Sequence, residues 1–160
     1  MVRVVHRWCP TRSLVLVGDT TYAAIEFLAT TRSVATIVTR LRLDARLFEP
    51  APPHVPGHKG RHRVVGPRLP TLAARLSDPA TVWLPLTVPF WYGETNRAIE
   101  TVSGTAVWYS TGLPPVPVRW VLIRDPANAF PPQALLYTDL DADAVRIVSW
   151  FVLRWQMEIV

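Results

Sequence analysis

The C-terminal stretch 141–160 constrains the fold more than any other part of the chain. It contains neither Gly nor Pro, begins with Asp141 and Asp143, and is almost wholly apolar thereafter. Because negative charge is favoured at a helix N-terminus, this pattern predicts a buried helix. A carboxylate in such a helix is costly unless it is paired or binds a metal, so Glu158 needs a partner. An ion pair with Arg154, four residues earlier, is the simpler of the two explanations.

Composition limits the classes of protein to which the chain can belong. Its 160 residues are 49% hydrophobic, enough for the core of one domain. The formal net charge of +5 favours an anionic partner, nucleic acid first. Cys9 is the only cysteine, which excludes an intramolecular disulfide and suits a reducing compartment. No run reaches the ~18 apolar residues of a membrane span and no secretory signal is evident, so we expect a soluble cytoplasmic protein.

Residues 1–46 have the pattern of a strand, a helix and a second strand. The apolar run 14–18 ends in Gly and predicts a central strand buried on both faces. Apolar residues at helical spacing over 20–30 predict a helix, and β-branched residues over 34–41 predict a strand parallel to the first. We therefore expect the ends of these two strands to lie side by side.

Charged residues follow both of these strands. Asp19 comes directly after the first strand, where it can cap the next helix. The carboxyl ends of strands are also where open α/β sheets place their chemistry, so a catalytic role is the alternative. Arg40, Arg42 and Arg46 fall near the end of the second strand, either beside Asp19 or on ordinary solvated surface.

Residues 47–132 differ in composition from the first part. The segment 50–70 is crowded with Pro and Gly, which excludes a long helix and predicts a loop. This loop carries Lys59, Arg61 and Arg63, which we expect to face DNA phosphates.

Runs rich in Trp, Tyr, Val and Thr, separated by Gly, predict antiparallel strands over 81–124. Residues 133–140 predict one more strand directly before the terminal helix, so 133–160 forms the third part of the chain. Most of the seven Trp belong in a core, although an exposed one could stack on a nucleobase.

Three segments of the chain have the wording of known motifs, and they are, in chain order, Val17-Gly18-Asp19-Thr20-Thr21-Tyr22, Leu136-Tyr137-Thr138-Asp139-Leu140, and Phe151-x2-Arg154-x3-Glu158. Together they resemble the DDE-type transposases of bacterial insertion sequences. The spacing of the last one is similar to the Tyr-x2-Arg-x3-Glu-x6-Lys signature of that family, with Phe in place of Tyr. Thr20 stands where relatives frequently have Arg. The resemblance spans nearly the whole chain.

The resemblance implies an α/β fold, a partial ribonuclease H-like core with a β-rich insertion before the last catalytic helix. Asp19 and Glu158 would be the second and third catalytic, metal-binding carboxylates, holding Mg²⁺ or Mn²⁺ in a two-metal site. Arg154 would contact DNA near the scissile phosphate, and Trp120 is a candidate for stacking on a base, although another alignment places Ala134 there. The activity implied is DNA strand cleavage and strand transfer on transposon ends and target DNA, with a homodimer possible on DNA.

Two parts of the family pattern are missing. No acid precedes Asp19, and the Lys of the signature would fall beyond Val160. We therefore expect an internal fragment that cuts DNA little or not at all on its own, and whose incomplete sheet exposes an edge. Two other interpretations stay open: a non-catalytic basic module that binds DNA, and a purely structural role in which Asp19 is a cap and Glu158 an ion-pair partner.

Overall fold

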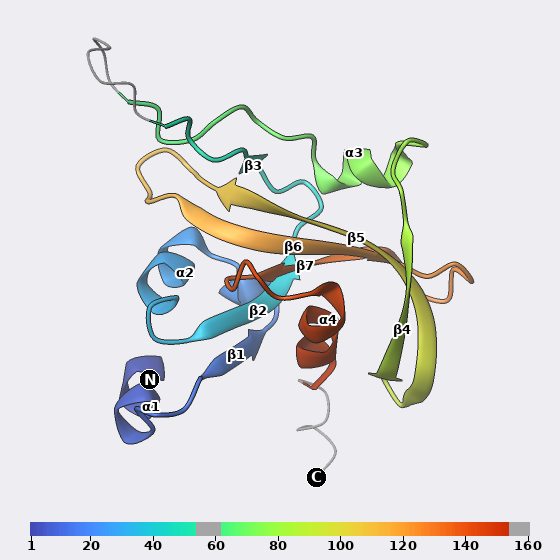
Figure 1. Ribbon diagram of the computed structural model, residues 1–160, viewed down its shortest axis with the longest axis horizontal. Coiled ribbons are helices and arrows are strands. Elements are labelled where there is room, and N and C mark those ends of the chain that lie inside the picture. The colour runs from blue at the N-terminus through green and yellow to red at the C-terminus, as the bar shows by residue number, and fades with distance from the viewer. Residues whose placement is uncertain (54–61, 154–160) are drawn as a thin grey trace.

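The computed structural model describes residues 1–53 and 62–153, which form a mixed α/β fold around one curled sheet (Figure 1). The expected α/β class is confirmed. In this part of the chain the strand order is β1-β2-β7-β6-β5-β3, with β4 also paired to β5. The strands are β1 (Val15–Gly18), β2 (Thr36–Leu41), β3 (Leu47–Phe48), β4 (Leu84–Trp91), β5 (Glu94–Trp108), β6 (Val116–Arg124) and β7 (Gln133–Tyr137). The helices are α1 (Val2–Trp8), the 3₁₀ helix η1 (Thr20–Tyr22), α2 (Ile25–Thr31), α3 (Leu72–Ser77) and α4 (Ala144–Val152).

Strands β1 and β2 pair in parallel, as expected, and β2 pairs antiparallel with β7. The prediction that the first strand is central is wrong, because β1 lies at one end of the strand order and has only β2 beside it in the described chain. Leu16 packs with the cluster on one face, while Val15 and Val17 pack with the cluster on the other. The apolar run therefore reports correctly that both faces are covered, but it carries no information about the outer edge.

The helix expected over 20–30 is divided in two. η1 ends at Tyr22, and α2 begins at Ile25 after Ala24 adopts extended backbone angles. Asp19 is the N-cap of η1, where its side chain accepts a hydrogen bond from the Thr21 N–H at 2.9 Å. The capping role expected for Asp19 is therefore confirmed.

The sheet is covered on both faces. Val118, Trp120 and Leu122 of β6 belong to the cluster that includes α2 and α3, whereas Val121 and Ile123 belong to the cluster with α4. This alternation places α2 and α3 on one face and α4 on the other. No periodic pattern had indicated α3, whose six residues bury only Leu72 fully.

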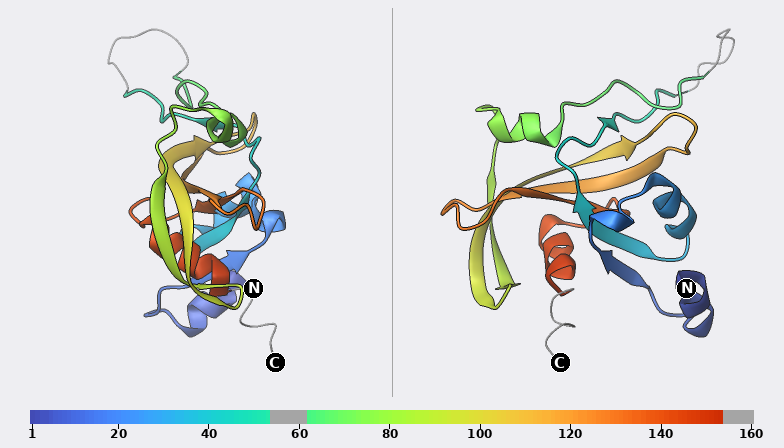
Figure 2. Two further views of the ribbon diagram at one scale, coloured as in Figure 1. Left: turned by 90° about the vertical axis from the view of Figure 1, so that its right-hand side faces the viewer. Right: turned by 180° about the vertical axis from the view of Figure 1, so that it is seen from behind.

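The β-rich middle of the chain continues the same sheet. β4, β5 and β6 pair antiparallel, as predicted. The β4–β5 hairpin turns at Tyr92 and Gly93, both of which have positive φ (47° and 92°), as a tight two-residue hairpin requires. The long hairpin curves out of the plane of β1 and β2, and α4 lies between the hairpin and these two strands (Figures 1 and 2).

The terminal helix α4 starts where the acids predicted. The Asp143 side chain caps it by accepting from the Arg146 N–H at 2.7 Å. Ile147, Val148, Phe151 and Val152 are buried against the sheet. None of the described helices combines the length and the apolar character needed to cross a bilayer.

Candidate functional site

Asp19 is exposed at the carboxyl end of β1. Val15 and Val17 point to the face that carries α4, so strand alternation directs Asp19 to the same face. The backbone carbonyl of Asp19 accepts a hydrogen bond from the buried Thr39 hydroxyl of β2. The hydrogen bond to its side chain and the hydrogen bond to its carbonyl together fix Asp19 at the ends of the parallel strands β1 and β2.

Arg40 links the end of β2 to α4. Its guanidinium lies over the ring of Phe151, 5.7 Å from the centroid, and its Nη2 donates to Gln133 Oε1 at 2.8 Å. Phe151 is fully buried. The first residue of the transposase-like signature therefore lies next to the carboxyl end of β2, on the face to which Asp19 also points.

A hollow of about 330 Å³ opens beside these strand ends, and we call it the strand-end groove. Its volume is at the low end of the ~300–1,000 Å³ range of small-ligand sites. Basic and polar side chains form part of its wall, and aromatic side chains form another part. Its lining residues are Thr20, Arg40, Leu41, Arg42, Leu43, Trp91, Tyr92, Phe130, Pro131, Pro132, Gln133 and Ala134.

The aromatic wall comes from two loops that are far apart in sequence. Phe130, between β6 and β7, stacks on Trp91 at a centroid distance of 4.9 Å. Tyr92, in the β4–β5 turn, meets Trp91 edge to face at 5.1 Å. Trp91 is buried, whereas Tyr92 and Phe130 keep part of their surface accessible.

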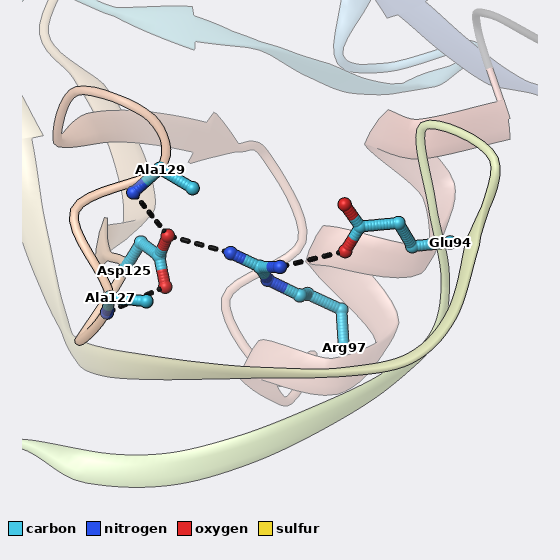
Figure 3. Close-up of polar contacts among 5 residues, drawn as sticks. All are labelled: Glu94, Arg97, Asp125, Ala127 and Ala129. Atoms are coloured by element: carbon cyan, nitrogen blue, oxygen red, sulfur yellow. Dashed lines mark hydrogen bonds and ion pairs between the residues drawn. The ribbon is translucent and has the colours of Figure 1, made fainter.

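Asp125 fixes these two loops relative to one another (Figure 3). Its carboxylate pairs with Arg97 of β5 at 2.7 Å and accepts from the Ala127 and Ala129 N–H groups at 3.1 and 2.7 Å. Arg97 also pairs with the exposed Glu94 at 2.8 Å. Burial alone would raise the pKa of Asp125, but the two N–H donors and Arg97 outweigh burial and hold this pKa below its usual value.

The structure describes only some of the residues that were predicted to bind DNA or metal. Glu158, Arg154, Lys59 and Arg61 lie outside the described residues, so their roles remain predictions. Arg63 is exposed in the Pro- and Gly-rich segment. Within residues 1–53 and 62–153, no three His, Cys, Asp or Glu side chains come close enough together to hold a metal ion.

Trp120 does not present its ring at the surface. It is 4% exposed and packs in the core on the face that carries α2 and α3. A Cβ added at Gly104 would lie 2.8 Å from the ring, and the Arg75 guanidinium lies over it at 5.2 Å. The accessible aromatic surface of the groove comes instead from Tyr92 and Phe130.

Sequence reasoning missed the most distinctive parts of the groove. Arg40 and Arg42 were placed at the strand end as one of two alternatives, and both do line the groove, whereas Arg46 is not among its lining residues. Phe130 and Asp125 lie in an irregular loop where no periodicity marks a buried or a functional side chain. Asp125 followed by Pro126 is the one local signal, since Asp at the start of a turn commonly accepts from nearby N–H groups.

Comparison of the chain with models of known protein families gives no match, and a search of curated proteins finds no significant match. Residues and geometry therefore carry the functional assignment.

Proposed function

We propose that this chain is part of a metal-dependent DNA strand-transfer enzyme of the DDE transposase type. The observation that supports it best is that Asp19, Arg40 and Phe151 share one face at the carboxyl ends of two parallel strands. The order along the chain, from strand and acid to a final strand and helix, agrees with that of the family. The finer fold assignment, a ribonuclease H-like core, is part of the same proposal.

Phe151 connects the described site to the residues of the signature. Counted along an α-helix, positions 154 and 158 fall on the face of position 151. Phe151 packs toward Arg40 and the strand ends. The proposal needs helical spacing to continue beyond Val152, the last residue of α4, so that Glu158 reaches the side of the sheet where Asp19 lies. The proposal requires this convergence, because one carboxylate alone does not make a magnesium site.

The donor chemistry suits the proposed ion, although the described residues do not complete its site. Mg²⁺ and Mn²⁺ prefer oxygen ligands, and Asp19 offers an exposed carboxylate at a rigid position. Asp19 and Glu158 are the residues that would hold the ion. When bound, such ions activate an attacking water or 3′-hydroxyl and stabilise the leaving oxygen of a phosphodiester.

Titration of the full chain with Mn²⁺, followed by electron paramagnetic resonance, tests this function. Asp19→Ala and Glu158→Ala should each weaken Mn²⁺ binding by about tenfold or more, because each removes a charged oxygen ligand. Asp44→Ala is the matched control, since Asp44 is an exposed acid that already pairs with Arg42 at 2.7 Å. Equal Mn²⁺ affinity in all three variants would refute the proposal.

A non-catalytic DNA-binding module is the second candidate. The specific observation in its favour is that the arginines Arg40 and Arg42 line the strand-end groove together with aromatic side chains, an arrangement that can bind a nucleic-acid strand without a metal ion. This function predicts DNA affinity that falls steeply with salt and is indifferent to Asp19→Ala and Glu158→Ala. The Mn²⁺ titration therefore separates the two candidates.

A further inference from the structure

Arg40 carries a charge that the described residues do not neutralise. It is half-buried, its Nη2 donates to a neutral amide oxygen, and its Nε is buried without an acceptor. No carboxylate in residues 1–53 and 62–153 forms an ion pair with it, whereas Arg42, Arg97 and Arg124 each pair with an acid at 2.6–2.8 Å. Among the described residues, Arg40 therefore differs from these three arginines in having no negative partner.

An unpaired, partly desolvated guanidinium is energetically unfavourable, and an anion supplied from outside would remove the penalty. The strand-end groove provides the space for such an anion, since Arg40 lines it together with Thr20 and Gln133. Gln133 uses Oε1 toward Arg40, so its N–H groups are the donors that it can offer to a ligand. The Thr20 hydroxyl is a further possible donor.

The aromatic residues that line the same groove narrow the choice of anion. Phe130 and Tyr92 present aromatic surface to the same groove, which suits a phosphate that carries a flat organic group better than a free inorganic ion. Arginine also matches phosphate oxygens with its planar fork of donors. The formal net charge of +5 agrees with a polyanionic ligand.

We propose that Arg40, with Thr20 and Gln133, binds a phosphodiester group of a nucleic-acid strand in the strand-end groove. The inference rests on the proposed function for the class of ligand, and it deepens that function by naming the residue that holds the strand beside Asp19. The site involves no metal ion.

Fluorescence anisotropy of a labelled 20-nucleotide single strand, in EDTA over a range of salt concentrations, tests this site. Arg40→Gln should weaken binding about tenfold, as expected for a lost charged hydrogen-bonding contact. The slope of log K against log salt should decrease in magnitude by about 0.7, the value for one phosphate contact on a single strand. Arg40→Lys keeps the charge and should retain the slope.

Arg32→Gln is the matched control. It removes the same charge from an exposed position that precedes β2, at the opposite end of the strand from Arg40. Its affinity and salt slope should stay close to those of the wild type. Equal losses in Arg40→Gln and Arg32→Gln would overturn the site, because binding would then depend on net charge alone.

Thermal unfolding with and without inorganic phosphate, at constant ionic strength, distinguishes the two sources of the anion. The site predicts that the oligonucleotide raises the Tm of the wild type far more than inorganic phosphate does. Equal shifts from the two ligands, both lost in Arg40→Gln, would overturn the nucleic-acid assignment. Without ligand, Arg40→Gln loses the contacts with Phe151 and Gln133 together with the partly buried charge, so the deciding measurement is the Tm shift caused by the oligonucleotide, which should be lost in this variant.

The presence of EDTA separates this test from that of the proposed function. If Asp19→Ala and Glu158→Ala leave the Mn²⁺ affinity unchanged while Arg40→Gln still weakens oligonucleotide binding, the transposase proposal is refuted and the phosphodiester site stands. If the two acid-to-Ala variants weaken Mn²⁺ binding while Arg40→Gln leaves oligonucleotide binding unchanged, only the phosphodiester site is refuted.

Discussion

Trp120→Ala is expected to destabilise the fold by about 3–5 kcal/mol and to leave the intrinsic DNA affinity of the folded protein unchanged. Trp120 is 4% exposed and packs among residues of β5, β6 and α3, so truncation leaves a cavity that the surrounding sheet cannot close. The Arg75 guanidinium over its ring would lose that contact as well. Urea denaturation gives the free energy of unfolding, and anisotropy in buffer without urea gives the affinity.

Trp8→Ala is the control for this substitution. Trp8 is 75% exposed at the end of α1, so the change should alter stability by no more than about 0.5 kcal/mol. A Trp120→Ala protein of normal stability that no longer binds DNA would contradict the packing seen here. That result would support the sequence-based prediction that Trp120 stacks on a base.

Asp125→Asn is expected to lower the Tm by about 10 °C, the range for breaking a buried ion pair in a domain of this size. The Asp125 side chain is 1% exposed and accepts from Arg97 and from two backbone N–H groups. Asn has a single accepting oxygen and no charge, so it can neither keep all three hydrogen bonds nor neutralise the guanidinium, and the loop that carries Phe130 should loosen. Differential scanning calorimetry measures the change.

Glu94→Gln is the matched control, because it changes the other, exposed partner of the same Arg97 and should shift the Tm by only a few degrees. The pH dependence gives a second check. The pKa of Asp125 is lowered in the folded protein, so its stabilisation is complete above the ordinary value of 3.8 and is lost as pH falls through the lower, folded value. The difference in stability between wild type and Asp125→Asn should therefore narrow below about pH 4. A constant difference down to pH 2 would contradict the role given to this carboxylate.

Local sequence patterns predicted the elements of this fold better than their arrangement. Three local signals agree with the structure: the runs rich in Trp, Tyr, Val and Thr in the β-rich middle, the acids before α4, and the position of Asp19. Strand order depends instead on contacts between residues that are far apart in the sequence. The run 14–18 has the composition of a central strand because both of its faces are covered, although its outer edge has no strand beside it in the described chain.

The candidate site could likewise be predicted from the sequence only where the signal is local. The position of Asp19 at a strand end followed from the residues around it. The environment of Arg40 depends on Gln133, 93 positions later, and on Phe151 of α4. The aromatic wall depends on an ion pair between residues 28 positions apart. Such contacts become visible only when the sheet brings these segments together.

The central claim is that positions 19 and 158 meet in space as ligands of one cation. Replacing both acids by Cys, in a Cys9→Ser background, changes the preferred metal from Mn²⁺ to a thiophilic ion such as Cd²⁺. Thiolate-to-Cd²⁺ charge-transfer absorbance then reports whether two sulfurs bind the same ion. The account predicts that the Asp19→Cys/Glu158→Cys protein binds one Cd²⁺ through two thiolates, far more tightly than either single variant. A double variant that binds Cd²⁺ no better than the single variants would contradict it.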